Sequence, residues 1–197
     1  MRPSLALLEI DGIARGYLAA DALVKRAPVQ LFAGEPVSPG KFLLFFGGGV
    51  AEVHEALLAG KAIAGDRLLD ELYLPQAHEE LWRGLAQDGW LRGGPPPPPR
   101  EQAGSALAIV EAIGAAATLL AADAACKAAF VALGALHLAR GIGGKGYFTL
   151  SGEQHDLEAA LEAAARAVTA GALVETQLLA SPHPELWGPV VPGSKGR

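Results

Sequence analysis

The segment of this chain that looks most like a chemical site is residues 141–146 (GIGGKG), which fits the G-x-G-x-x-G pattern of dinucleotide-binding loops. Such a loop binds a pyrophosphate when a helix begins directly after it, because the amides of the first helical turn then face the phosphates. Here the aromatic run 147–150 (YFTL) follows, which is typical of a strand. A phosphate-binding P-loop is excluded as well, since Gly146 rather than Ser or Thr follows Lys145. The spacing therefore predicts a tight loop between two strands.

No other group of residues has the spacing of a catalytic or metal site. The five histidines are not spaced as ligands of one site, and the sequence contains no H-E-x-x-H motif and no His/Cys cluster. The single cysteine, Cys126, excludes an intrachain disulfide framework, and its place in an apolar helical segment predicts a packed, unreactive thiol. We therefore expect no bound metal, no cofactor and no enzymatic activity.

Two Asp–Lys pairs lie one helical turn apart, Asp21 with Lys25 and Asp123 with Lys127. On a helix such i,i+4 pairs share one face, and an exposed pair contributes only about 0.3–0.5 kcal/mol to stability. So small a gain explains poorly why the pair occurs twice. We therefore expect both pairs to serve in contacts between subunits.

The composition excludes several classes of partner. The formal net charge of −5 and the absence of a basic run argue against binding to nucleic acid. Hydrophobic residues make up 51% of the chain, yet no uncharged apolar run of about 18 residues occurs, so we expect subunit interfaces rather than a membrane span. Glu9 interrupts the apolar start before a signal-peptide core develops, which favours a location in the cytosol.

The two Asp–Lys pairs belong to a duplication of nearly the whole chain. Residues 7–31 and 109–133 align without a gap, and an ordered Glu…Gly…Ala-Asp-Ala…Lys pattern is present in both. A repeat of about 100 residues has the size of a small domain. We expect a first domain over 1–92, a Gly/Pro-rich linker over 93–104, a second domain over 105–188 and a flexible tail over 189–197.

Each copy is predicted to follow the order strand, helix, strand, strand, helix, strand. The expected strands are 5–10, 29–32, 42–46 and 68–74 in the first copy and 107–111, 131–138, 147–150 and 173–179 in the second. The expected helices are 14–27, 50–64, 115–129 and 154–170. A βαββαβ order folds as a four-stranded antiparallel sheet with two helices on one face. The predicted fold class is therefore α+β, with two tandem ferredoxin-like domains.

The duplicated pattern resembles the shell-protein domain of bacterial microcompartments. In this sequence it consists of Glu9, Gly12, Ala20-Asp21-Ala22, Lys25, Gly40 and Gly48 in the first copy, and of Glu111, Gly114, Ala122-Asp123-Ala124, Lys127, the GIGG loop and Gly152 in the second. Two such domains in one chain resemble the tandem-domain members of that family. The resemblance implies a homotrimer whose six domains form a pseudohexamer, which tiles with hexameric and pentameric shell proteins into the shell of an organelle in the cytoplasm.

The resemblance also implies a central pore for small metabolites, lined by the loop before the third strand of each domain. By position the pore-lining residues are Ser38, Pro39 and Gly40 in the first copy, and Ile142, Gly143 and Gly144 in the second. Lys41 and Lys145 would lie near the pore and bias it toward anions. The two Asp–Lys pairs would lie at the edges where neighbouring tiles meet.

Two departures from the family pattern stand out. Family members often carry an arginine in a Pro-Arg-Pro-His-like segment at the tile edge, but residues 75–78 (PQAH) and 180–183 (ASPH) contain none. Some tandem members hold an iron–sulfur cluster at the pore through a loop cysteine, where this chain has Ser38 and Ile142, so no cluster is expected. The alternative to a shell tile is a trimeric ferredoxin-like protein that binds metabolites or regulates, and does not tile.

Overall fold

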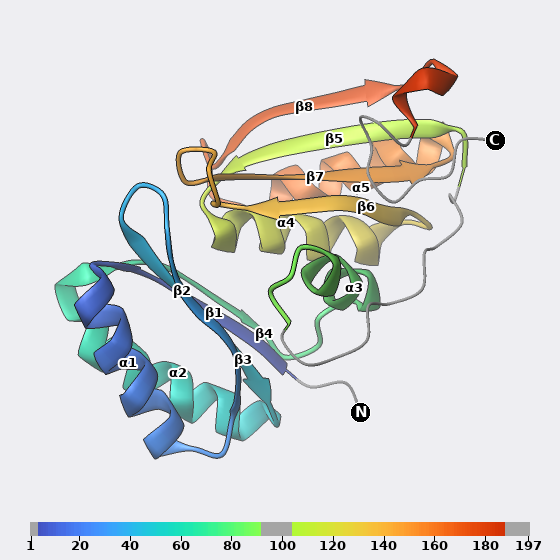
Figure 1. Ribbon diagram of the computed structural model, residues 1–197. Helices are drawn as coiled ribbons and strands as arrows, with labels where there is room; N and C mark the ends of the chain where they lie inside the picture. The colour runs from blue at the N-terminus through green and yellow to red at the C-terminus, as the bar shows by residue number, and fades with distance from the viewer. Residues whose placement is uncertain (1–3, 92–103, 188–197) are drawn as a thin grey trace. The chain divides into compact units, whose positions relative to one another are not determined.

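The computed structural model describes residues 4–91 and 104–187 of the chain, which form two compact units (Figure 1). Among the described residues, unit 1 holds 4–77, 90–91 and 139–144, and unit 2 holds 78–89, 104–138 and 145–187. The units therefore differ from the two sequence copies by the exchange of short segments. The predicted linker, apart from Gly104, and the predicted tail lie outside the described residues.

Unit 1 is built on a four-stranded antiparallel sheet with two helices. Its elements are β1 (Ser4–Asp11), α1 (Ile13–Arg26), β2 (Gln30–Val37), β3 (Lys41–Gly48), α2 (Val50–Ala64), the short 3-10 helix η1 (Gly65–Arg67) and β4 (Leu68–Leu74). The strand order β2-β3-β1-β4 is that of the ferredoxin-like fold. Because β1 pairs with both β3 and β4 and is buried along nearly its whole length, its sequence is mainly apolar, and Glu9 is its one buried charged residue.

Unit 2 repeats this topology with the strand order β6-β7-β5-β8. Its elements are β5 (Ala106–Ile113), α4 (Ala115–Ala128), β6 (Ala132–Leu138), β7 (Lys145–Gly152), α5 (Gln154–Ala167) and β8 (Leu173–Leu179). The predicted fold class is confirmed. The clearest difference in length is β2, which continues to Val37 where an end at Phe32 was predicted. Pro36 is tolerated there because β2 is an edge strand, on which an N–H that faces away from the sheet makes no ladder bond.

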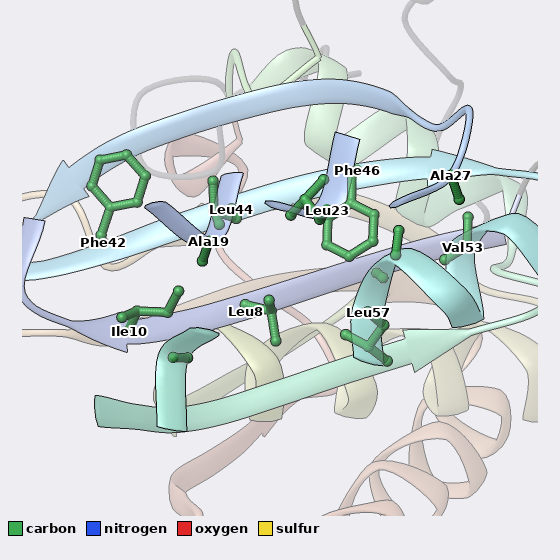
Figure 2. Packing of buried hydrophobic residues seen from close by; sticks show 13 residues of the cluster. Leu8, Ile10, Ala19, Leu23, Ala27, Phe42, Leu44, Phe46, Val53 and Leu57 are labelled. Atoms are coloured by element: carbon green, nitrogen blue, oxygen red, sulfur yellow. The ribbon is translucent and has the colours of Figure 1, made fainter. Parts of the chain in front are cut away.

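The core of unit 1 lies between the sheet and its two helices (Figure 2). Alternate residues of a strand point to the same face of a sheet, which is why the core takes every second side chain from the central strands. It contains Leu8 and Ile10 of β1, Phe42, Leu44 and Phe46 of β3, Ala19 and Leu23 of α1, and Val53 and Leu57 of α2. Full burial of a side chain such as Leu or Phe contributes about 1.5–3 kcal/mol to stability.

None of the helices in the described ranges is long and apolar enough to span a membrane.

One α-helix was not predicted from the sequence, α3 (Glu79–Gln87). Its sequence EELWRGLAQ is rich in helix-forming residues, and the His78 side chain begins it by accepting a hydrogen bond from the backbone N–H of Glu80 at 3.3 Å. Although α3 follows the first sheet in the sequence, it belongs to unit 2 and packs against β6 and α4. At the equivalent place in the second copy, the chain forms only the short 3-10 helix η2 (Pro184–Leu186).

Candidate functional site

The six residues predicted to line a pore lie in two inter-strand loops. Residues 38–40 connect β2 to β3, and residues 139–144 connect β6 to β7. Both loops belong to unit 1, although the second comes from the second sequence copy. Gly144 has a φ of +84°, and a Cβ added there would lie 3.2 Å from Pro39 Cδ and 3.3 Å from the Ser38 carbonyl oxygen. The structure thus brings the two predicted loops together, and only glycine fits this contact without strain.

An open hollow of about 390 Å³ lies beside the two loops, lined by residues 35–40 with Arg140 and Gly141. Arg140 Nε donates a 2.6 Å hydrogen bond to Glu35 Oε1, which makes an ion pair between two residues of this lining. The Arg140 guanidinium also lies 3.7 Å from the centroid of the Trp90 ring. A charge-assisted hydrogen bond and a cation–π contact therefore hold the start of the second loop beside β2.

Each lysine that follows a loop is bound by a glutamate of its own unit. Lys41 Nζ lies 3.2 Å from Glu9 Oε2, and Lys145 Nζ lies 2.6 Å from Glu111 Oε1. Glu9 and Glu111 occupy equivalent positions on β1 and β5, so the glutamate that recurs in the sequence is the partner of the lysine that recurs. The Glu9 carboxylate is buried, whereas the Lys145–Glu111 pair is more exposed.

The charges around the loops are therefore balanced, because Arg140, Lys41 and Lys145 each have a carboxylate partner. Of the six predicted loop residues, Gly144 is buried. The other five are exposed: Ser38, Pro39, Gly40, Ile142 and Gly143. The exposed loops offer the Ser38 hydroxyl and backbone groups as hydrogen-bond partners. A neutral hydrogen bond of this kind has a net value of about 0.5–1.5 kcal/mol. Such an arrangement suits brief contacts with small polar molecules.

The loops do not fit an iron–sulfur cluster, since such clusters are held by cysteine thiolates. Position 38 is serine, position 142 is isoleucine, and Cys126 is buried on α4 in unit 2. Nor does a helix follow the glycines of the second loop, because Lys145 begins β7. Within residues 4–91 and 104–187, no group of three or more His, Cys, Asp and Glu side chains could hold a metal ion.

The two Asp–Lys pairs form in different surroundings. Asp21 Oδ2 accepts a 2.6 Å hydrogen bond from Lys25 Nζ, and both side chains are exposed. Asp123 Oδ2 accepts a 2.5 Å bond from Lys127 Nζ, but the Asp123 side chain is only 4% exposed. Its other oxygen, Oδ1, accepts a 2.7 Å bond from the backbone N–H of His78. In unit 2, therefore, the pair holds the start of α3 against α4.

Four charged residues around the loops were not predicted as site residues: Glu9, Glu111, Glu35 and Arg140. Glu9 and Glu111 could have been found, because a glutamate and a lysine that recur together in both copies indicate an ion pair. No such signal marks Glu35 and Arg140, which are 105 positions apart and come from different copies. Their pairing depends on the exchange of the 139–144 loop into unit 1.

Two tandem α+β domains of ferredoxin-like topology, with inter-strand loops of both copies gathered in one unit, define the class of this protein. The model of the BMC domain matches the chain twice, over residues 4–77 and 106–182. The chain therefore belongs to the BMC-domain family of bacterial microcompartment shell proteins and carries two copies of the domain. Members of this family are structural proteins rather than enzymes.

Individual relatives agree with this assignment. The chain is 36% identical over 194 residues to the bacterial microcompartment shell protein PduT of Citrobacter freundii, which covers 98% of this chain and 100% of that protein. It is 32% identical over 82 residues to the carboxysome shell protein CcmK2 of Synechococcus elongatus, covering 40% of this chain and 80% of that protein. It also resembles the crystal structure of a microcompartment protein from Desulfitobacterium hafniense DCB, with a TM-score of 0.78, 34% identity and coverage of 94% and 98% of the two chains. The family predicted from the duplicated pattern is confirmed.

Proposed function

We propose that this chain is a shell subunit of a bacterial microcompartment that works as a homotrimer with a central pore. Three copies carry six BMC domains, and six similar domains can close into a ring through head-to-tail contacts. The ring forms a pseudohexagonal tile and assembles with hexameric and pentameric shell proteins around an organelle in the cytoplasm. The observation that carries the proposal is that loops from two different BMC domains lie together in unit 1.

In this ring each chain contributes two different loops, so the pore has three-fold rather than six-fold symmetry. Ser38, Pro39, Gly40, Ile142 and Gly143 line the opening, since all five are exposed in the single chain. The buried Gly144 instead sets the close contact between the loops. A polar loop that alternates with an apolar one gives small metabolites weak contacts, and conduction requires that contacts within a pore stay weak.

The lysines near the pore give it little preference for anions. Lys41 and Lys145 would favour anions if their ammonium groups were uncompensated, but Glu9 and Glu111 each supply an opposite charge within hydrogen-bond distance. The Arg140–Glu35 pair is balanced in the same way. We therefore propose that the size and polarity of a metabolite decide its passage more than the sign of its charge does.

Contacts between neighbouring tiles are assigned to Lys25 and Lys127. Both lysine side chains remain exposed although each has an aspartate partner. The segments in which family members often carry an arginine contain none in this chain, so these two lysines are the cations of the repeated pattern that can reach a neighbouring tile.

The hollow beside the loops favours one second candidate, a trimeric metabolite-binding protein that does not tile. Calorimetry separates the two functions, and light scattering tests the trimer that both of them require. The shell proposal predicts a particle of three 20.2 kDa chains and no saturable binding of small polar metabolites. A monomer in solution would contradict the ring. Saturable binding by a trimer that forms no layers would support the metabolite-binding protein instead.

A further inference from the structure

The end of the first sequence copy is held in unit 2 by contacts that involve both backbone and side chains. The backbone N–H of His78 donates to Asp123 Oδ1 at 2.7 Å, and the fully buried Glu80 accepts a 3.0 Å bond from the backbone N–H of Leu133. Close packing accompanies these bonds, since a Cβ added to Gly84 would lie 2.6 Å from Leu133 Cδ2. Residues 78–87 are therefore bound to a surface made by α4 and β6.

The first copy presents the equivalent surface uncovered. Asp21 is the counterpart of Asp123 in the aligned sequence, yet its side chain is 57% exposed whereas that of Asp123 is 4% exposed. Leu31 is the counterpart of Leu133, and it is 40% exposed although Leu133 is buried. Both leucines lie where the register of an edge strand shifts against its neighbour. On α1, Tyr17 and Val24 extend the exposed surface one turn to either side of Asp21.

The second copy presents a segment that matches the bound one. Residues 183–187 (HPELW) repeat residues 78–82 (HEELW), and the local fold is the same at the start. The His183 side chain accepts a 3.3 Å hydrogen bond from the backbone N–H of Glu185, as His78 does from Glu80. Glu185, however, is exposed where Glu80 is buried.

We propose that residues 183–187 of one chain bind the α1–β2 surface of a second copy of this chain. The backbone N–H of His183 donates to Asp21 of the second copy, and the Glu185 carboxylate accepts from the backbone N–H of Leu31. The occupant is another copy because residues 183–185 and the α1–β2 surface are exposed within one chain, and because their counterparts, residues 78–82 and the α4–β6 surface, bind each other. This contact rests on the proposed ring, and it joins two different surfaces head to tail, as a closed ring requires.

Leu31→Asp in the full-length chain tests the receiving surface, and Leu186→Asp tests the binding segment. A charge buried at the centre of an interface raises the dissociation constant of the trimer about a hundredfold or more, so both variants are expected to be monomeric at concentrations where the unsubstituted chain is a trimer. Leu69→Asp is the matched control, because Leu69 is also exposed, at 49% against 40% for Leu31, and lies on β4, the other edge strand of the same sheet. Circular dichroism verifies that each variant is folded.

Mixing the two monomeric variants makes the test specific. The Leu31→Asp chain keeps its segment and the Leu186→Asp chain keeps its receiving surface, so native mass spectrometry should detect heterodimers but neither homodimer. A trimer that survives Leu31→Asp, or a mixture that gives no heterodimer, overturns the contact while leaving the ring itself standing. An unsubstituted chain that is monomeric overturns the ring of the proposed function as well, so the two failures are distinguishable.

Discussion

The backbone N–H of His78 donates a 2.7 Å hydrogen bond to a carboxylate oxygen of Asp123, and Lys127 binds the other oxygen of the same carboxylate at 2.5 Å. The Ala-Asp-Ala-x-x-Lys pattern of the second copy is therefore more than an exposed ion pair. Asp123 accepts a hydrogen bond from His78, the residue that precedes α3, and Lys127 fixes the position of the Asp123 carboxylate. The equivalent ion pair of the first copy, between Asp21 and Lys25, also forms, but the Asp21 carboxylate is exposed.

Asp123→Ala is expected to lower the stability of the fold by about 1–3 kcal/mol, because it leaves the His78 N–H without this acceptor in a partly buried place. Asp66→Ala, at an exposed aspartate of η1, is the control and should change stability by less than about 0.5 kcal/mol. Urea denaturation followed by circular dichroism measures both. Equal effects of the two substitutions would remove the special role assigned to Asp123.

In each copy the first helix packs against the third strand, and the larger of the two residues in contact comes from a different element in each copy. In unit 1, a Cβ added to Gly16 of α1 would lie 2.3 Å from the Phe42 ring of β3. In unit 2, Thr118 and Gly146 occupy the equivalent positions, and a Cβ added to Gly146 would lie 2.3 Å from Thr118 Oγ1. The large residue is thus on the strand in one copy and on the helix in the other.

Gly146→Phe alone is therefore expected to destabilise unit 2 by about 1–3 kcal/mol or more through overpacking. The double substitution Thr118→Gly with Gly146→Phe rebuilds the arrangement of unit 1 and should recover a large part of that loss. A double-mutant cycle in urea measures the coupling, which is expected to exceed about 1 kcal/mol. Additive effects would show that the two side chains do not compete for one space.

The raised pKa of Asp70 on β4 makes the stability of the fold depend on pH. Partial burial raises the pKa of Asp70 above its ordinary value, and the nearby carboxylates of Glu9 and Glu71 add to the rise, while a hydrogen bond from the backbone N–H of Glu71 opposes it. Because the folded state binds this proton more tightly than the unfolded state does, the ionised Asp70 costs stability as the pH rises above about 4.

Asp70→Asn is accordingly expected to make the protein slightly more stable at neutral pH, with a difference that disappears below about pH 4. Melting temperatures of both proteins between pH 3 and 7 would check this. A variant that is less stable than the unsubstituted chain at neutral pH would show that the charge of Asp70 is favourable in the fold.

Lys25→Ala combined with Lys127→Ala should leave trimers intact but impair the formation of layers, because the exposed lysine side chains are assigned to contacts between tiles. Lys61→Ala is a suitable control, since Lys61 lies on α2 and is paired with Glu71. Electron microscopy counts layers, and light scattering verifies the trimer. Normal layers from the double variant would contradict the edge role of these lysines.

The regular elements of both sheets followed from hydrophobic periodicity and from the duplication, because each strand and helix buries one face in its own domain. The sequence could not predict that α3 packs in unit 2. The repeat shows that HEELW and HPELW correspond, but it does not show which sheet either segment binds. For the same reason the Arg140–Glu35 pair had no sequence signal. The Lys41–Glu9 pair could have been predicted, because both residue types recur at matched positions.

In the proposed shell subunit, three chains close into a tile with both loop types at its centre. Cryo-electron microscopy of the purified full-length chain under conditions that favour layers tests it most directly. We expect flat, hexagonally packed layers of three-fold rings, each with a central opening bordered in alternation by residues 38–40 and 142–143. Discrete particles that never form layers, or rings in which these loops lie at the outer edge, would contradict it.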